Sequence, residues 1–442
     1  MRTGQKRLTS SRIILLGFAA AIIIGTLLLL LPIASSDGVA APFSDALFTA
    51  TSAVCVTGLV VRDTATCWSG FGQAVILTLI QIGGMGVVTV AVAIAMISGK
   101  KISLKQRSTM QEAISAHKVG GIVHLTGFII RVTAFFELAG ALLLAPGFCR
   151  EFGFPKGIWY AVFHSISAFC NAGFDLMGTR APYSSLTSFA DSPLINAVIM
   201  TLIIVGGIGF LTWDDIRTNR LRFQRYRMQS KIILLTSALL IVLPGLYFFF
   251  FEFSSLPVKA RILESLFQAV TPRTAGFNTA DLTAISQTGS AVLIVLMLVG
   301  GSPGSTAGGM KTTTLAVLLS TAISVFRQRE YSHFFGRRIE DRTVRNAITI
   351  LMMYLVLFLT GGLILSRLES LPLLVCLFET ASAIGTVGLT MGITPALGQI
   401  SRLILILLMF VGRVGGLTLI FSAVSGSRGS TARLPQEKLT VG

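Results

Sequence analysis

Four short stretches of the sequence each lead to a glycine that is followed by a large apolar residue, and each could present backbone carbonyl oxygens to a cation. A phenylalanine precedes the glycine by ten residues in the first, second and fourth stretches, and by nine in the third. Glycine lets the backbone leave the usual conformations and approach an axis closely, because it carries no Cβ. Rings of carbonyl oxygens from four such loops can replace the hydration shell of an alkali cation. The candidate ion-binding residues are Val56, Thr57, Gly58, Asn171, Ala172, Gly173, Thr274, Ala275, Gly276, Thr386, Val387 and Gly388.

The fourth loop, T-V-G at residues 386–388, matches the first three letters of the potassium-filter motif TVGYG, whereas the other loops keep only the glycine. One such tripeptide is common by chance, but four glycines at matched offsets are not. The alternative interpretation is that small residues permit close helix packing. That interpretation is the better one for Gly83, Gly84, Gly206 and Gly207, which we expect to seat the neighbouring short helix.

A second candidate site is a glycine-rich segment between two apolar runs, G-G-S-P-G-S-T-A-G-G-M-K-T-T-T from residue 300. Irregular backbone persists at membrane depth only where protein or a water-filled cavity satisfies its N–H and C=O groups. We therefore expect a broken helix here and a gate below the filter. A cation at this depth would oppose a permeating cation and could bind loop carbonyls. The predicted gate residues are Ser302, Pro303, Gly304, Ser305, Thr306, Ala307, Gly308, Gly309, Lys311 and Arg413.

Other polar residues near these sites allow more than one role. Arg413 could instead be a structural anchor for helix ends. Arg273 precedes the third loop and is expected behind the filter, while Glu264 and Glu379 could orient loop N–H groups or attract cations at the mouth. We expect His164 to be a core residue, and Glu137 has no explanation from the sequence. The five cysteines show no metal-ligand spacing, which is typical of small buried apolar residues.

The elements that must position these residues are membrane helices. Hydrophobic residues make up 53% of the 442 residues and charged residues 12%, a composition typical of a polytopic membrane protein. Eight apolar runs are long enough to cross a hydrocarbon core of about 30 Å. Their approximate ranges are 12–33, 72–98, 122–146, 193–213, 230–251, 288–326, 345–366 and 400–424.

Between the members of each pair of spans lies a shorter apolar stretch, at 42–55, 157–170, 261–273 and 371–385. Self-similarity at a fixed period indicates a repeated structural unit. The predicted fold is therefore an all-α membrane protein of four M1–pore helix–M2 repeats, with eight transmembrane helices around a pseudo-fourfold pore. The predicted units are 12–98, 122–213, 230–326 with the break at 302–309, and 345–424, followed by a cytoplasmic tail at 425–442.

The formal net charge of +17 does not indicate a nucleic-acid-binding protein, because of where the charges lie. Five segments hold 24 of the 36 Lys and Arg residues, and the connections between these segments carry few. This alternation is the positive-inside pattern, so both termini and three loops are expected in the cytoplasm. The basic loops could also dock an acidic partner or anionic membrane lipids.

The sequence resembles the Trk/Ktr/HKT superfamily of potassium transporters over nearly its whole length, and within it the ion-translocating subunits (KtrB) of bacterial Ktr systems. The matching motifs are T-A-T-S-A-V-C-V-T-G-L-V-V at 49–61, L-I-Q-I-G-G-M-G at 79–86, T-P-R-T-A-G-F-N-T at 271–279, G-S-T-A-G-G-M-K-T-T-T at 304–314 and G-R-V-G-G at 412–416. In the family, glycine in all four loops accompanies potassium selectivity, and serine in the first loop accompanies sodium preference. Since Gly58 occupies the first loop, the resemblance implies potassium uptake across the cell inner membrane.

The resemblance also implies a homodimer and a cytoplasmic ring of nucleotide-binding regulatory subunits of the KtrA type, and it leaves open whether sodium ions act as an activator. A secondary transporter with a midplane site at the broken helix is the alternative function. It is disfavoured because the sequence predicts four parallel repeats and one broken span. An intramembrane enzyme would need clustered acids, histidines or a nucleophile with its base, and the sequence offers none.

Overall fold

The computed structural model describes residues 9–98, 102–114, 121–220 and 222–416, together with Thr418 and Glu437. The N-terminal eight residues and nearly all of the predicted tail at 425–442 therefore lie outside the described part. Four long apolar helices open the four repeats. They are α1 (Ser10–Leu29), α7 (Ile122–Phe152), α11 (Met228–Tyr247), which continues as a π-helical turn η5 (Phe248–Glu252), and α15 (Asp341–Glu369). Each is long and apolar enough to cross a membrane.

A short helix follows each long one and matches the four predicted re-entrant stretches. These pore helices are α2 (Phe43–Cys55), α8 (Phe154–Phe169), α12 (Val258–Val270) and α16 (Leu373–Gly385). Proline lies directly before the first residue of three of them and at the second position of α8, where its fixed φ suits a helix start and its missing N–H is not needed. The repeated phenylalanines Phe48, Phe163, Phe267 and Phe378 have no exposed surface, so the repeated sequence pattern reports the packing of the pore helices into the core.

The second helix of every repeat stops at a glycine-rich segment. In the first two repeats the helix turns sharply, by 96° between α4 (Gly70–Met85) and α5 (Val87–Ile97) and by 93° between α9 (Pro193–Ile208) and α10 (Phe210–Asn219). The third has an irregular segment between α13 (Gln287–Leu298) and α14 (Thr312–Phe326), and in the fourth α17 (Gln399–Val414) ends before Gly415.

The expectation of continuous spans over 72–98 and 193–213 is therefore wrong. Gly86 has φ 84° and Gly209 has φ 96°, and Gly415 has φ 87°, a backbone conformation that an α-helix cannot contain and that favours glycine. Among the described residues, four helices meet the length and composition of a membrane span, or six if each bent pair counts as one span. In the ranges expected for the spans at 288–326 and 400–424, the described residues form the shorter helices α13, α14 and α17.

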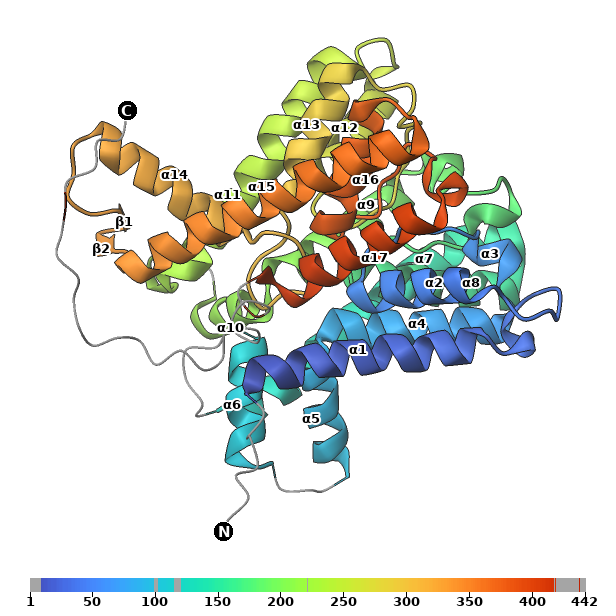
Figure 1. Ribbon diagram of the computed structural model, residues 1–442, viewed down its shortest axis with the longest axis horizontal. Helices are drawn as coiled ribbons and strands as arrows, with labels where there is room; N and C mark the ends of the chain where they lie inside the picture. Colours follow the sequence, from blue (N-terminus) through green and yellow to red (C-terminus); the bar gives the residue numbers. More distant parts are fainter. Residues whose placement is uncertain are drawn as a thin grey trace.

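The remaining elements lie in the connections. They are α3 (Thr64–Cys67), α6 (Leu104–Ala113), the 3-10 turns η1 (Pro32–Ala34), η2 (Met177–Thr179), η3 (Thr187–Phe189), η4 (Phe223–Arg225) and η6 (Thr394–Ala396), and a hairpin of β1 (His333–Phe334) and β2 (Arg337–Arg338). The hairpin, α10, α5 and α6 gather at one end of the helix bundle, and α3 lies toward the other end (Figure 1).

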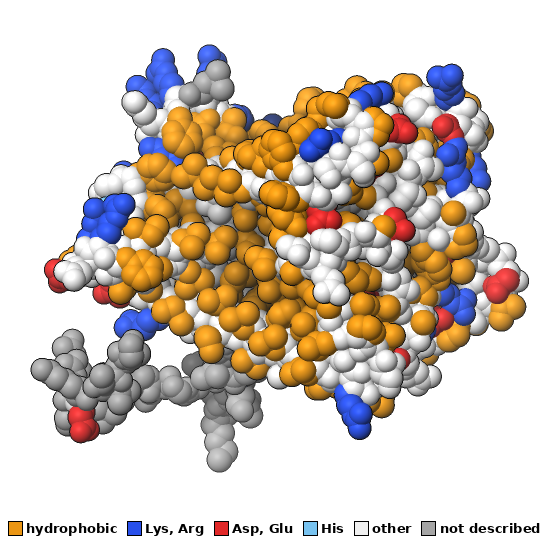
Figure 2. Space-filling model, turned by 90° about the horizontal axis from the view of Figure 1, so that it is seen from above, with side chains coloured by type: hydrophobic (Ala, Val, Ile, Leu, Met, Phe, Trp, Pro, Cys, Tyr) orange, Lys and Arg blue, Asp and Glu red, His pale blue; other side chains and the backbone are white. Residues whose placement is uncertain are grey.

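On the face shown in Figure 2, hydrophobic side chains cover a broad central part, and Lys and Arg side chains lie mostly toward the edges. This distribution suits a protein surrounded by hydrocarbon in its middle and by head groups and water at its ends.

Candidate ion pathway and gate

The four predicted filter loops have the same backbone conformation. Each pore helix gives way to a residue with positive φ that begins the loop, and the loop's glycine, two residues later, also has positive φ. The values are 56° and 91° for Val56 and Gly58, 59° and 68° for Asn171 and Gly173, 66° and 79° for Thr274 and Gly276, and 51° and 95° for Thr386 and Gly388. A residue other than glycine held in the left-handed region is strained by about 1–3 kcal/mol. The same strained conformation in four places shows that the fold requires this turn in every repeat.

Backbone hydrogen bonds fix each turn. The middle residue of the loop donates its N–H to a carbonyl near the end of the pore helix, as in the capping motif that closes many helices. In repeats one, two and four this carbonyl lies five residues back, and in the third repeat four residues back. The bonds are Thr57 N to Ser52 O at 2.8 Å, Ala172 N to Ser167 O at 2.7 Å, Ala275 N to Thr271 O at 3.0 Å and Val387 N to Ser382 O at 2.8 Å.

The four loops meet in a closed ring. A Cβ placed on any of the four glycines would lie 2.7 Å or less from the carbonyl oxygen of the middle residue in the next loop, and the fourth loop contacts the first. The pairs are Gly58 with Ala172 O, Gly173 with Ala275 O, Gly276 with Val387 O and Gly388 with Thr57 O. All twelve predicted filter residues are buried. The structure therefore brings together the residues that the sequence assigned to one ion-binding ring.

A hydroxyl behind each loop makes one of two kinds of bond. Ser52 and Ser382 accept a hydrogen bond from the glycine N–H of the first and fourth loops, at 3.1 and 3.0 Å. Ser167 and Thr271 instead donate to the carbonyl of the residue after the glycine, in the second and third loops. The ring thus has four similar backbones but two kinds of support.

In the second and fourth repeats, the residue after the repeated phenylalanine binds the chain that leaves the filter. Glu379 accepts hydrogen bonds from Thr390 Oγ1, at 2.9 Å, and from Thr394 Oγ1. His164 Nδ1 lies 2.7 Å from the Tyr160 carbonyl, and its Nε2 lies 3.3 Å from the N–H of Leu176 and accepts from it. Glu379 thus binds two hydroxyls of the segment after the filter, which is neither of the two roles considered for it. His164 binds the N–H of Leu176 as well as packing in the core. His164 and Glu379 occupy the same position of the sequence repeat, directly after Phe163 and Phe378. That match is the sequence signal for the role of His164.

Arg273 lies behind the third loop. Its Nη2 donates to Ser237 Oγ at 3.0 Å, and its carbonyl accepts a bond from Asn171 Nδ2 at 3.2 Å. The side chain is almost fully buried. Arg273 therefore connects the third repeat to the second loop from outside the ring.

The glycine-rich segment of the third repeat is irregular backbone whose hydrogen bonds go to other protein groups. Ser302 N and Thr306 N donate to the carbonyls of Gly207 and Gly206, at 3.0 and 3.3 Å, and Gly309 N donates to Gly412 O at 3.3 Å. Because three of its N–H groups have protein acceptors and the segment borders a hollow, it can lie at membrane depth. Gly206 also packs closely against Phe169 O of the second pore helix, in line with its expected packing role.

The segment lies directly against one end of the filter. A Cβ on Gly308 would overlap the side chain of Thr386, and one on Gly309 would lie 2.8 Å from Gly385 O. Thr306 Oγ1 lies 3.0 Å from both Phe169 O and Asn171 Oδ1, and its one proton can be donated to either. The predicted gate residues therefore touch the first residue of two filter loops, the second and the fourth.

Two cations hold this segment by its carbonyl oxygens. Lys311 Nζ donates to Ala307 O at 2.8 Å and to Gly308 O at 3.3 Å. Arg413 donates from Nη1 to Thr306 O and from Nη2 to Gly83 O and Gly84 O, the last at 3.3 Å. Arg413 thus ties the segment of the third repeat to the end of α4 in the first repeat, so the gate and anchor interpretations describe the same contacts.

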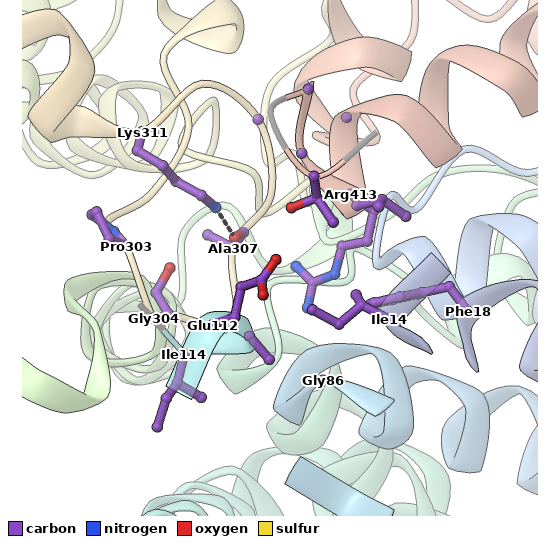
Figure 3. Close-up of a pocket in the computed structure, with 18 of the residues that line it drawn as sticks. Ile14, Phe18, Gly86, Glu112, Ile114, Pro303, Gly304, Ala307, Lys311 and Arg413 are labelled. Atoms are coloured by element: carbon purple, nitrogen blue, oxygen red, sulfur yellow. Dashed lines mark hydrogen bonds between the residues drawn. The ribbon is translucent and has the colours of Figure 1, made fainter. Parts of the chain in front are cut away.

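Lys311 and Arg413 line a hollow of about 400 Å³ beneath the segment. Figure 3 shows the two side chains approaching Ala307 from different sides, with Glu112 of α6 directed into the same space. Ser11 Oγ donates to Glu112 Oε1 at 2.5 Å. The sequence gives no indication of Glu112, because nothing in the polar connection between the first two repeats shows that α6 reaches the hollow.

An ion-paired aspartate at the start of the first pore helix was also missed. Asp45 binds Arg62 at 2.6 Å, just beyond the first filter loop, and Arg402 of α17 at 2.7 Å. The Asp45–Arg402 pair joins the first repeat to the last, where no chain connection closes the ring. Glu137, in the middle of α7, accepts from Gln81 Nε2 of α4 at 3.2 Å, so it links repeats two and one.

Comparison with known proteins identifies relatives over the full length of the chain. The family model TrkH, described as cation transport protein, matches residues 12–430. The potassium/sodium uptake protein NtpJ of Enterococcus hirae is 39% identical, with 99% of this chain and 98% of that protein covered. The Ktr system potassium uptake protein B of Bacillus subtilis is also 39% identical, with 99% and 97% covered.

The crystal structure of the potassium transporter TrkH from Vibrio parahaemolyticus superposes with a TM-score of 0.75, at 19% identity, and covers 95% of this chain and 86% of that one. At this identity the likeness establishes the fold alone. The predicted class, an all-α membrane protein with repeated pore helices, is confirmed.

Proposed function

The chain belongs to the TrkH family of cation transport proteins, and we propose that it carries potassium ions across the cytoplasmic membrane through the ring of four glycine loops. One observation carries this proposal. Four loops of matching backbone contact one another in a closed cycle, each glycine against the next loop's carbonyl. A ring of this kind supplies oxygen ligands in place of water.

The ion in this proposal is potassium and the twelve filter residues are its site. The carbonyls of Thr57, Ala172, Ala275 and Val387 belong to equivalent positions of the four loops. Glycine at the third position leaves no side chain in the ring, which keeps the ligands to carbonyl oxygens. This chemistry needs no bond to be made or broken, and the family is one of transport proteins.

The gate in this proposal is the segment 302–309 with Lys311 and Arg413. The support for it is position and charge. The segment contacts Thr386 and Asn171 at the filter, and two cations lie beside it, where they raise the electrostatic energy of a permeating cation. Opening then requires that the segment leave the hydrogen bonds that hold its carbonyls.

The partners are proposed from the relatives. The Bacillus subtilis relative is named protein B of a Ktr system, and a component so named acts with other components. We propose that this chain forms a homodimer, that a cytoplasmic ring of nucleotide-binding subunits of the KtrA type regulates it, and that both termini lie in the cytoplasm. Sodium as an activator belongs to the same proposal, since one relative is named a potassium/sodium uptake protein.

A secondary transporter is the competing function, and one argument against it is weaker than the sequence suggested. The second helices of the first two repeats also break, at Gly86 and Gly209, and broken helices are typical of transporter sites. The closed ring of four parallel loops still favours a conducting pore, because an alternating-access site does not need such a ring.

Uptake of rubidium by vesicles that contain the purified full chain tests the function. We expect uptake driven by membrane potential alone, blocked by external potassium and far less by sodium. Parallel vesicles with and without sodium measure activation by that ion. Uptake that appears only when a sodium or proton gradient is imposed would contradict a conducting pore and favour the transporter.

A further inference from the structure

A second hollow, of about 550 Å³, lies outside the ion pathway where α5, α6 and α7 meet. Three basic side chains line it, Arg107 from α6 and His124 and Arg131 from α7, and none of its lining residues is acidic in the part of the chain that the structure describes. If these basic residues only fixed the membrane topology, we would expect them to be spread along a cytoplasmic loop. Here three from two helices converge on one space.

One of these basic side chains has an N–H group without a hydrogen-bond acceptor among the described residues. Arg107 Nε is inaccessible and has no hydrogen-bond partner in the described chain. A polar N–H that is buried without a partner is costly. The hollow also begins at the N-terminus of α7, whose first N–H groups attract an anion. The positive charge of the lining side chains and the N–H groups at the start of α7 both fit a phosphate group.

The depth of the hollow points to a lipid. α7 has 31 residues, about 46 Å of helix, whereas the hydrocarbon core is about 30 Å thick. Arg131 and Arg150 bound the 18 residues 132–149, which span about 27 Å. Arg131 therefore lies at one edge of the hydrocarbon, and the hollow on its N-terminal side lies at the level of the head groups.

An exposed apolar stripe continues from the hollow toward the membrane centre. Phe135, Leu138 and Leu142 follow Arg131 at helical spacing on one face of α7, and they are 66%, 64% and 66% exposed. A free phosphate would use only the cations. A phospholipid would use both features, with its phosphate in the hollow and an acyl chain along the stripe.

We propose that this hollow binds the head group of an anionic phospholipid from the leaflet that the positive-inside pattern assigns to the cytoplasm. Arg107 and Arg131 bind the phosphate, His124 donates a further hydrogen bond, and Gly127 leaves the space between them open. A Cβ on Gly127 would meet only Met96 Cε, at 3.9 Å, so a larger residue fits there and fills the hollow without changing its charge.

Native mass spectrometry of the delipidated full chain, titrated with phosphatidylglycerol or phosphatidylcholine, tests the proposal. We expect one saturable phosphatidylglycerol site that phosphatidylcholine does not occupy. The double variant Arg107→Gln/Arg131→Gln should bind about 30-fold more weakly, because each cation near the surface contributes about a factor of five. Gly127→Leu should lose the site while every charge remains.

The matched control is Arg337→Gln/Arg345→Gln, which removes two exposed cations away from the hollow and should leave binding unchanged. Phosphatidylglycerol binding that survives in both hollow variants would overturn the proposal, as would equal binding of phosphatidylcholine. Displacement of the lipid by millimolar glycerol phosphate would assign the hollow to a soluble phosphate instead. Disulfide cross-linking of two copies through Phe135→Cys would assign the stripe to a protein interface.

Discussion

The filter and the segment beneath it are built in opposite ways. The filter repeats one backbone four times, and each loop contacts the next in the same manner. The segment 302–309 occurs once. Lys311, Arg413 of the fourth repeat, and backbone carbonyls of the second and fourth repeats hold it. At the position equivalent to Arg413 the other repeats have Gly84, Gly207 and Gly301. The symmetric filter is therefore built from sequence that all four repeats share. The proposed gate is built from residues that are particular to the third and fourth repeats.

This contrast also separates two physical requirements. An ion-binding ring needs equivalent ligands at equal distance from an axis, which repetition provides. A barrier that opens needs an element with two accessible arrangements, and a segment held by a few hydrogen bonds to two cations provides that. One region must be rigid and the other releasable, although they are in direct contact.

The largest expected effect comes from breaking the equivalence of the ring. Gly58→Ser places a side chain where φ is 91° and where a Cβ would press on the second loop. A strained residue costs about 1–3 kcal/mol, and we expect the preference for potassium over sodium to fall about tenfold or more. Competition of the two ions for rubidium uptake measures this.

Gly70→Ser is the matched control, since a Cβ at Gly70 meets nothing within 4 Å. The control should keep the selectivity of the unchanged chain. Equal ion competition in the two variants would remove residues 56–58 from the filter.

The next largest effect should come from releasing the unique segment. Arg413→Ala removes the bonds to Thr306 and to Gly83 and Gly84, and a charge-assisted hydrogen bond contributes about 1.5–3 kcal/mol. We expect basal rubidium flux to rise about tenfold with selectivity unchanged, and a shortened 302–309 segment to do the same. Arg345→Gln, which removes an exposed cation, should leave the flux unaltered.

A purely anchoring role predicts the reverse. If Arg413→Ala and the shortened segment are both well expressed and dimeric but show unchanged or lower flux, the segment is not a barrier.

A smaller effect should separate the supports behind the ring. Glu379 binds two threonine hydroxyls, whereas the equivalent Thr49 is buried with no partner for its hydroxyl in the described chain. Glu379→Ala leaves those threonines without their acceptor, and we expect a clear loss of thermal stability. Thr49→Val should be neutral or slightly stabilising, because it removes an unpaired polar group.

Thermal unfolding of the two purified variants in the same detergent gives the comparison. If Glu379→Ala and Thr49→Val lowered the unfolding temperature equally, the hydrogen bonds of Glu379 would not stabilise the protein specifically. Any substitution on these pore helices would then be equally destabilising.

The smallest effect should come from the hydroxyls that accept the glycine N–H. Ser52→Ala and Ser382→Ala each remove one neutral hydrogen bond of about 1 kcal/mol, so we expect a change of about fivefold or less in ion preference. Ser167→Ala removes a donor to Phe174 O and leaves the glycine N–H of its own loop untouched, so its effect on selectivity should be weaker than that of Ser52→Ala. The ion-competition assay ranks the three variants, and the reverse order would contradict the two kinds of support.

The parts of the molecule that the sequence predicted are those that repeat. Phenylalanine and glycine at matched offsets give the pore helices and the ring, because the same local backbone forms wherever the pattern occurs. The bends at Gly86 and Gly209 were missed although G-G-M-G and G-G-I-G are alike, since a glycine in an apolar run is equally consistent with close packing.

Contacts between distant segments had no local signal. Asp45 and Arg402 are 357 residues apart, and Glu112 reaches the gate from a polar connection. The sequence around Asp45 and around Arg402 looks like an ordinary helix end, and the sequence around Glu112 looks like an ordinary solvated helix. Only the closure of the ring, which brings the last repeat against the first, makes the Asp45–Arg402 pair apparent.

Anomalous scattering from thallium or rubidium in crystals of the full chain tests the central claim most directly. We predict an anomalous peak on the axis among the carbonyls of Thr57, Ala172, Ala275 and Val387, which is lost when sodium replaces the heavier ion. A peak only in the hollow beside Lys311 and Arg413, or at the bends of the second helices with none in the ring, would contradict it.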